Sequence, residues 1–178
     1  MRRAWRGAVL ALAGAGLLTG CSAADLSLIS VGIGADGTPQ VTMAPCGDDA
    51  IGTADFFVHE AVARTTPPPG APQPAVTTPL TASEEGWMAG GSPLAAGRVT
   101  FPLFSPPATW AVREWGAERS LKPGRRYSLS FHAPGFADYS GTVSFTAEDL
   151  AGLGPGEVWA DGRAMSPKKF RKLVADEC

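Results

Sequence analysis

The chain has 178 residues, with 15 Lys or Arg and 17 Asp or Glu, so its formal net charge at neutral pH is −2. Three of the arginines lie within the first six residues, and without them the net charge is −5. This size fits one domain with a substantial core, and the charge excludes the general excess of cations that is typical of nucleic-acid-binding proteins.

The first twenty residues have the pattern of a secretory signal. Arg2, Arg3 and Arg6 precede an apolar run at 7–18 that contains only Gly, Ala, Val and Leu. This run is too short to cross a bilayer core, which is about 30 Å thick and takes roughly 20 helical residues. We therefore interpret residues 1–20 as a cleavable signal rather than a permanent membrane span.

The end of this run resembles the lipobox of bacterial lipoproteins. It ends in Leu18-Thr19-Gly20-Cys21, and small residues follow. In lipoproteins the cysteine sulfur receives a diacylglyceryl group and the signal is cut directly before it. The resemblance therefore implies lipidation of Cys21 and attachment to the extracytoplasmic face of the cell membrane, where two or more acyl chains anchor a protein stably. The alternative is a plain signal peptide that happens to contain a cysteine.

Two further cysteines, Cys46 and Cys178, remain in the mature chain. Because disulfides persist in the oxidising compartments to which exported proteins go, we expect one intramolecular bond between these two residues. An intermolecular bridge and a buried free thiol are the alternatives. Two cysteines alone do not form a metal site, since structural zinc takes four ligands and catalytic zinc takes three.

We assign residues 21–25 to a lipidated tether and residues 26–178 to a single domain. Apolar residues recur at alternate positions in several short segments, which is the period of a half-buried strand. In the segment at 54–62, for example, Phe56 and Val58 share one face while Phe57 and His59 share the other. The predicted strands are 26–33, 40–44, 54–62, 98–104, 109–115, 126–132 and 139–146, and Asp36-Gly37 is predicted to turn the first strand into the second.

Six prolines lie among the fifteen residues 65–79. Proline cannot donate a hydrogen bond to a sheet and favours the polyproline II conformation, so we predict a solvated and fairly stiff loop here. A proline-rich ligand for another protein is the functional alternative to a tolerated insertion between strands.

A short helix is predicted at the end of the chain, from Ser166 as N-cap and Pro167 as first residue to about Ala175. Phe170, Leu173 and Val174 have the spacing of one buried face. Four cations precede two acidic residues, an order that opposes the helix dipole. We interpret this as a solvated face, and the alternative is a basic patch for anionic head groups or a partner.

Short strands separated by Pro and Gly favour an all-β fold, an Ig-like antiparallel β-sandwich with a short C-terminal helix. The chain also resembles a group of uncharacterised lipoproteins from high-GC Gram-positive bacteria. That resemblance covers both ends better than the middle, and it implies a β-rich body and a location but no reaction. It rests on the lipobox, Met43-Ala44-Pro45-Cys46, the Pro-Gly-Glu-Val-Trp segment at 155–159, Ser166-Pro167-Lys168-Lys169-Phe170 and the final Cys178.

The sequence contains none of the common catalytic patterns. His59 and His132 lack the spaced ligands of a metal motif, and no nucleophile elbow or phosphate-binding loop is present. We therefore expect no enzymatic activity, no cofactor and no metal. Trp87, Trp110, Trp115 and Trp159 are the candidates for a sugar-stacking platform, and the alternative is that they belong to the core.

Function is therefore predicted mainly from location. We expect a membrane-anchored extracytoplasmic lipoprotein with a non-enzymatic binding or structural role, which meets membrane lipid through Cys21 and an envelope protein or cell-wall polymer through its domain. The alternative is a cell-wall or carbohydrate-binding module that is accessory to an enzyme or transporter.

Because 109–115 is one predicted strand, Trp110 and Trp115 should lie on opposite faces, so both cannot be core residues.

Overall fold

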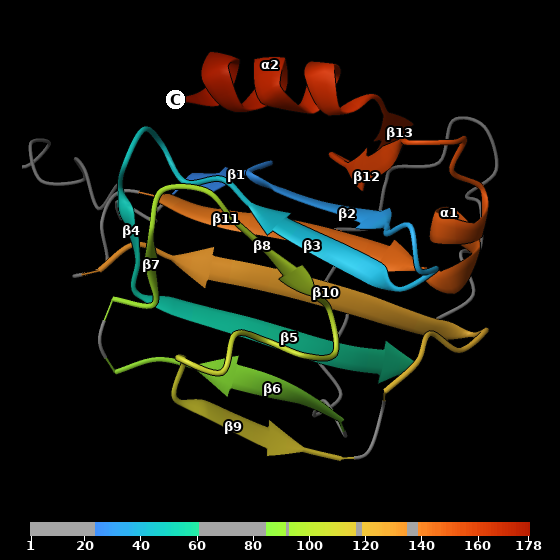
Figure 1. Cartoon of the computed structure of the whole chain (residues 1–178), viewed down its shortest axis with the longest axis horizontal. Coiled ribbons are helices and arrows are strands. Elements are labelled where there is room, and N and C mark those ends of the chain that lie inside the picture. The colour runs from blue at the N-terminus through green and yellow to red at the C-terminus, as the bar shows by residue number, and fades with distance from the viewer. Residues whose placement is uncertain (1–23, 61–84, 92, 117–118, 135–138) are drawn as a thin grey trace, which may run out of the picture.

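The computed structural model describes residues 24–60, 85–91, 93–116, 119–134 and 139–178. The signal, Cys21 and the proline-rich segment at 65–79 lie outside these residues. Two sheets stack face to face in the described part of the chain, and one helix lies along an edge of the stack (Figure 1). The prediction of an all-β sandwich with a short C-terminal helix is confirmed.

The larger sheet has the strand order β1-β11-β10-β5-β6-β9, and the smaller has the order β13-β12-β2-β3-β8. The strands of the larger sheet are β1 (Ala24–Leu26), β5 (Thr53–Glu60), β6 (Glu85–Ala89), β9 (Val112–Trp115), β10 (Arg125–His132) and β11 (Tyr139–Thr146). Those of the smaller sheet are β2 (Ile29–Ile33), β3 (Pro39–Met43), β8 (Val99–Pro102), β12 (Val158–Ala160) and β13 (Arg163–Met165). A separate short pair consists of β4 (Ala50–Ile51) and β7 (Ala95–Ala96).

Alternation between buried and solvated residues explains the long central strands. In β10 the side chains of Tyr127, Leu129 and Phe131 are buried, and the serines between them lie on the other face. The neighbouring strand β5 aligns Phe56 with Leu129, so the same face of both strands points into the sandwich. The larger sheet therefore has one face in the core and one face toward solvent, as is common in antiparallel sheets.

Two hairpins at the ends of the chain follow from local turn chemistry. The β2–β3 turn is closed by Asp36, whose Oδ1 accepts hydrogen bonds from Thr38 N at 3.0 Å and from Thr38 Oγ1 at 2.7 Å. Both bonds favour the ionised form and lower the pKa of Asp36. Asp161 and Gly162 turn β12 into β13 with φ angles of 52° and 66°, which is the conformation that a two-residue hairpin requires.

The C-terminal helix α2 (Pro167–Glu177) begins where the sequence predicts and ends two residues later than predicted. Ser166 Oγ accepts a hydrogen bond from Lys169 N at 3.3 Å, which satisfies one of the free N–H groups of the first turn. Phe170 and Val174 are buried and Leu173 is partly buried. The helix therefore docks through the face that the spacing predicts.

Several details differ from the sequence prediction. The first strand breaks at Ser27 and Leu28, and β1 pairs with β11 in parallel, so the larger sheet is mixed and its first strand includes Ala24 and Asp25 of the predicted tether. The strands β4, β6, β7, β12 and β13 were not predicted. The short helix α1 (Ala147–Ala151) was not predicted either, although its capping box of Thr146 and Asp149 is visible in the sequence.

Phe56→Ala is expected to lower the free energy of unfolding by about 3–5 kcal/mol, because it removes a fully buried ring. Phe56 stacks on Tyr127 and meets Trp87 and Phe104, with ring centroids 5.8–6.0 Å apart. Phe57→Ala is the matched control on the solvated face, with an expected loss of about 1 kcal/mol. Urea unfolding measures both changes, and equal losses would contradict the assignment of the two faces.

Candidate functional site

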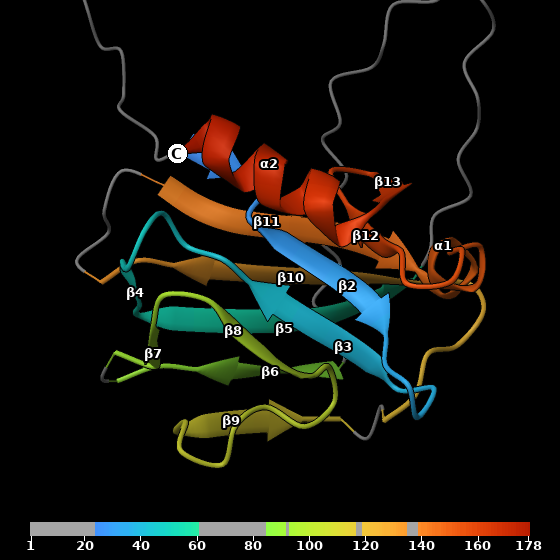
Figure 2. The same cartoon turned by 45° about the horizontal axis from the view of Figure 1, so that its top comes forward.

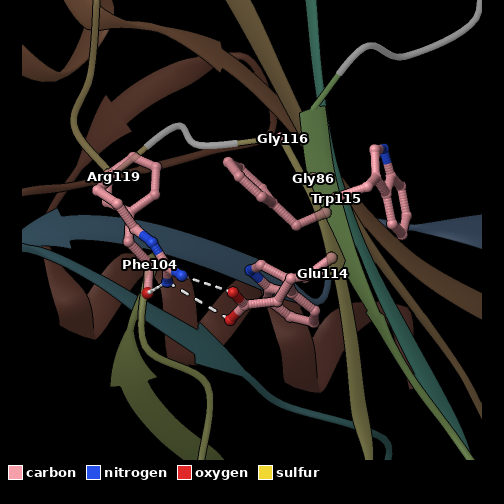
Figure 3. Close-up of a pocket in the computed structure, with 8 residues that line it drawn as sticks. Gly86, Phe104, Glu114, Trp115, Gly116 and Arg119 are labelled. Atoms are coloured by element: carbon pink, nitrogen blue, oxygen red, sulfur yellow. Dashed lines mark hydrogen bonds and ion pairs between the residues drawn. The ribbon is translucent and has the colours of Figure 1, made fainter.

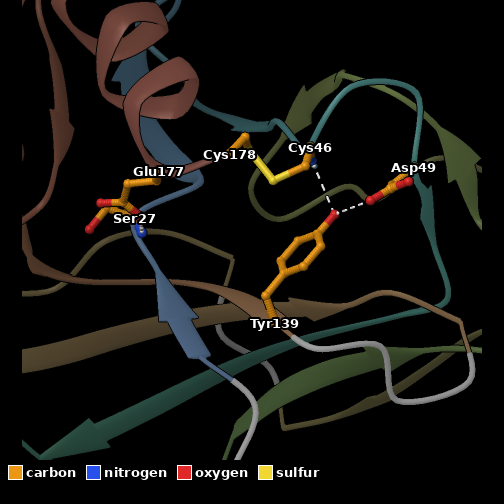
Figure 4. Close-up of a disulfide and its surroundings, with 6 residues drawn as sticks. All are labelled: Ser27, Cys46, Asp49, Tyr139, Glu177 and Cys178. Carbon is orange, nitrogen blue, oxygen red and sulfur yellow. Dashed lines mark hydrogen bonds between the residues drawn. A yellow bond between two sulfur atoms is a disulfide. The ribbon is translucent and has the colours of Figure 1, made fainter.

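The disulfide between Cys46 and Cys178, with two hydrogen bonds beside it, connects the segment after β3, the end of α2 and the start of β11. Its Cα atoms lie 5.4 Å apart, and it joins the segment after β3 to the end of α2 (Figure 4). Cys46 N donates a hydrogen bond to Tyr139 Oη at 3.0 Å, and this hydroxyl donates to Asp49 Oδ2 at 2.9 Å. Burial raises the pKa of Tyr139, which stays a neutral donor at neutral pH. The predicted intramolecular pairing is confirmed.

Two of the four candidate tryptophans belong to the core. Trp87 and Trp110 are 3% and 6% exposed, and Trp87 Nε1 donates a hydrogen bond to Leu103 O at 3.1 Å. Trp110 lies in a turn before β9, where its N–H donates to Pro107 O, and the strand predicted at 109–115 begins only at Val112. The premise that one strand carries both Trp110 and Trp115 is therefore wrong.

Trp115 and Trp159 are both half-buried, and they differ in what they contact. Trp159 Nε1 donates a hydrogen bond to Ser144 O at 3.0 Å, so this indole fastens β12 to β11. The ring of Trp115 packs on that of Phe57, with centroids 5.9 Å apart and planes inclined at 48°. Trp115 projects from the opposite side of β9 from Glu114, away from the core (Figure 3).

We use the name aromatic face for Phe57, His59, Met88 and Trp115 on the solvated side of the larger sheet. Gly86 of β6 lies in register between Phe57 and Trp115, and a Cβ there would overlap the carbonyl oxygen of Phe56 and come within 3.2 Å of Trp115 Cζ2. The glycine therefore lets the two rings approach across β6. Met88 is 45% exposed, and the His59 ring lies 6.2 Å from that of Phe57. The result is a partly apolar strip on the solvated side of the larger sheet, with Asp55 and Arg113 in register with Met88.

Polar groups of β5 and β10 border the aromatic face. Ser128 is in register with Phe57, and its Oγ lies 3.1 Å from His59 Nε2. Burial, and then the positive charge of Arg126, lower the pKa of His59, so its imidazole is neutral at neutral pH. Burial raises the pKa of Asp55, although the nearby His132 opposes this shift. Hydroxyl, imidazole and carboxyl groups therefore lie beside the ring of Phe57, which packs on that of Trp115.

The two histidines do not come together in the fold. His59 is in register with Arg126, and His132 lies six residues further along the same strand, which corresponds to about 20 Å. Within the described ranges, no group of three His, Cys, Asp or Glu side chains could hold a metal ion. No helix in that part of the chain is long and apolar enough to cross a membrane.

A concave feature lies at the end of the sandwich, beside the β2–β3 turn. It is an open pocket of about 550 Å³, within the size range of small-molecule sites. Arg119 on its wall donates hydrogen bonds to Phe104 O at 3.1 Å and to Glu114 Oε2 at 2.5 Å (Figure 3). Its main apolar lining residues are Ile33, Pro39, Pro102, Phe104 and Leu121. Because Glu114 already pairs the cation, the pocket is essentially an apolar one.

No family model matches this chain, and neither the curated proteins nor the solved structures contain a match. The functional argument therefore rests on the residues and the geometry described above.

Proposed function

We propose that this chain is a cell-envelope lipoprotein, anchored through Cys21 to the extracytoplasmic face of the cell membrane, with a non-enzymatic binding or structural role. The observation that supports it best is the disulfide, which uses the two cysteines other than Cys21. A bond of this kind suits an oxidising compartment outside the cytoplasm. It also leaves Cys21 as the only cysteine without a partner in the chain.

The position of β1 adds a geometric consequence to this proposal. Because β1 begins at Ala24, only three residues' length of chain, at most about 11 Å, separates the Cα atom of Cys21 from the folded body. The domain would therefore rest close to the membrane, with the β1 edge of the larger sheet nearest to it. The opposite edge, β9, is five strand spacings away, or about 24 Å (Figure 1).

Substitution of Cys21 tests the proposal, because membrane attachment depends on this one sulfur. We expect the substituted chain to leave the membrane fraction. A chain that stays there without Cys21 would contradict the anchor.

A specific observation favours a second candidate, binding of a cell-wall polysaccharide. Sugar rings present C–H groups that pack on aromatic faces and hydroxyls that need hydrogen-bond partners. The aromatic face offers Phe57 and Trp115 for packing, with Ser128, His59 and Asp55 beside them. In the proposed orientation this surface lies toward β9, on the part of the domain farther from the anchor.

Trp115→Ala is expected to weaken binding to purified, insoluble cell-wall polysaccharide about tenfold, the effect of losing a contact worth about 1.4 kcal/mol. Co-sedimentation measures the loss. Ile33→Ala is the control, because Ile33 is 46% exposed on the other sheet and should not touch the sugar. Equal binding by the Trp115 variant would remove the second candidate, as would cross-linking on intact cells that recovers protein but no polysaccharide.

A further inference from the structure

The outward side of α2 carries a cluster of cations, which we call the basic face. Lys168, Lys169, Arg171 and Lys172 are all exposed, and the buried Phe170 lies on the opposite side of the helix. The chain beyond residue 20 has twelve Lys and Arg residues and a net charge of −5. One third of its cations therefore lie on a helix of eleven residues, in a protein that is otherwise acidic.

The arrangement of these cations does not stabilise the helix. The first turn of α2 contains no acidic residue and the last turn no basic residue, the reverse of what the helix dipole favours. Lys172 Nζ pairs with Asp176 at 2.6 Å. In the part of the chain that the structure describes, the side chains of Lys168, Lys169 and Arg171 form no ion pair. Three cations are therefore available to an outside anion.

The basic face lies on the same edge of the domain as β1, which begins three residues after Cys21. Ser27 N, directly after β1, donates a hydrogen bond to Glu177 Oε2 of α2 at 2.6 Å. Figures 1 and 2 show α2 above the β1 and β11 edge of the larger sheet and β9 at the opposite edge, and Figure 4 shows Ser27 beside the end of α2. A membrane that holds Cys21 would therefore lie next to α2.

We propose that the basic face of α2 binds the head groups of anionic phospholipids in the membrane to which Cys21 is attached. This inference rests on the proposed lipid anchor, and it fixes the orientation of the domain, with α2 toward the bilayer and the aromatic face away from it. Each cation that lies within a Debye length, roughly 8 Å, of an anionic membrane raises the association constant of the protein with that membrane about fivefold.

The test uses the mature chain, residues 21–178, carrying Cys21→Ala, so that neither lipid nor the signal contributes, and measures co-sedimentation with vesicles. We expect binding at low salt to phosphatidylcholine vesicles that contain phosphatidylglycerol, and none to phosphatidylcholine alone. Lys168→Gln/Lys169→Gln/Arg171→Gln should weaken binding about 100-fold. Arg113→Gln/Arg125→Gln/Arg126→Gln removes the same charge from the larger sheet and should change binding only slightly.

Absence of binding to the anionic vesicles, or equal loss in both triple variants, would overturn the proposal. The thermal midpoint of the α2 variant should not fall, because its cations oppose the helix dipole, and a fall would show that they serve the fold instead. The lipid on Cys21 is measured separately, by the mass of the native chain. Failure of the anchor and failure of the basic face therefore give different results.

Discussion

Cys21→Ala should move this protein from the membrane fraction to the soluble extracytoplasmic fraction. A single myristoyl chain binds a bilayer with an association constant of about 10⁴ M⁻¹, and each additional chain strengthens attachment by a comparable factor. Removing a diacylglyceryl group should therefore weaken attachment by several orders of magnitude. The basic face of α2 contributes far less, and salt screens its contribution.

The comparison is made by fractionation after a high-salt wash, which removes chains held only by charge. Ser22→Ala is the matched control, because it changes the neighbouring residue and keeps the sulfur that carries the lipid. It should remain with the membrane. Retention of the Cys21 variant after the wash would show that another segment holds the chain.

Loss of the Cys46–Cys178 bond is expected to lower the free energy of unfolding by about 5 kcal/mol. The bond spans 132 positions, and in the loop-entropy model closure on that scale restricts the unfolded chain strongly. A domain is commonly stable by only 5–15 kcal/mol, so this loss is a large part of the total. The end of α2 should fray as well, since the bond would no longer hold Cys178 beside the segment after β3.

Two single variants and one double variant test how much this disulfide stabilises the domain. Cys46→Ser and Cys178→Ser each remove the same bond, so their losses should be equal, and the double variant should lose no more than either one. Urea unfolding under non-reducing conditions measures all three. Losses of less than about 1 kcal/mol, or losses that add in the double variant, would contradict the entropic account.

Local pattern was enough to predict the central strands and the C-terminal helix. In β10 and β11 large apolar residues alternate with small polar ones, because each strand has one face in the core and one in water. Ser166 and Pro167 define the start of α2 without help from the rest of the fold. For these elements, the residues that determine the structure lie within or directly beside the element itself.

The missed elements depend on distant partners. The strand β1 is three residues long and forms only beside β11, more than a hundred positions away. The strand β6 contains Gly86, which weakens the strand pattern and is needed because a Cβ there would overlap the carbonyl oxygen of Phe56. Trp110 was placed in β9 because the turn that links Pro107 to Trp110 was not recognised.

The aromatic face was only half visible in the sequence. The alternation in β5 indicates that Phe57 and His59 share the side opposite Phe56, and the four tryptophans were identified as candidates. The pairing of Phe57 with Trp115 could not be predicted, because it depends on the register of β5, β6 and β9 across an unpredicted strand. The position of α2 beside β1 likewise depends on the tertiary fold.

The intact mass of the native protein extracted from membranes is the most direct test of the proposed lipoprotein. The account predicts a chain that begins at Cys21, carries a diacylglyceryl group on that residue, and lacks the two hydrogens that the Cys46–Cys178 bond removes. A chain that begins at another residue, or that begins at Cys21 with a free thiol and no lipid, would contradict the anchor on which the proposed location and orientation depend.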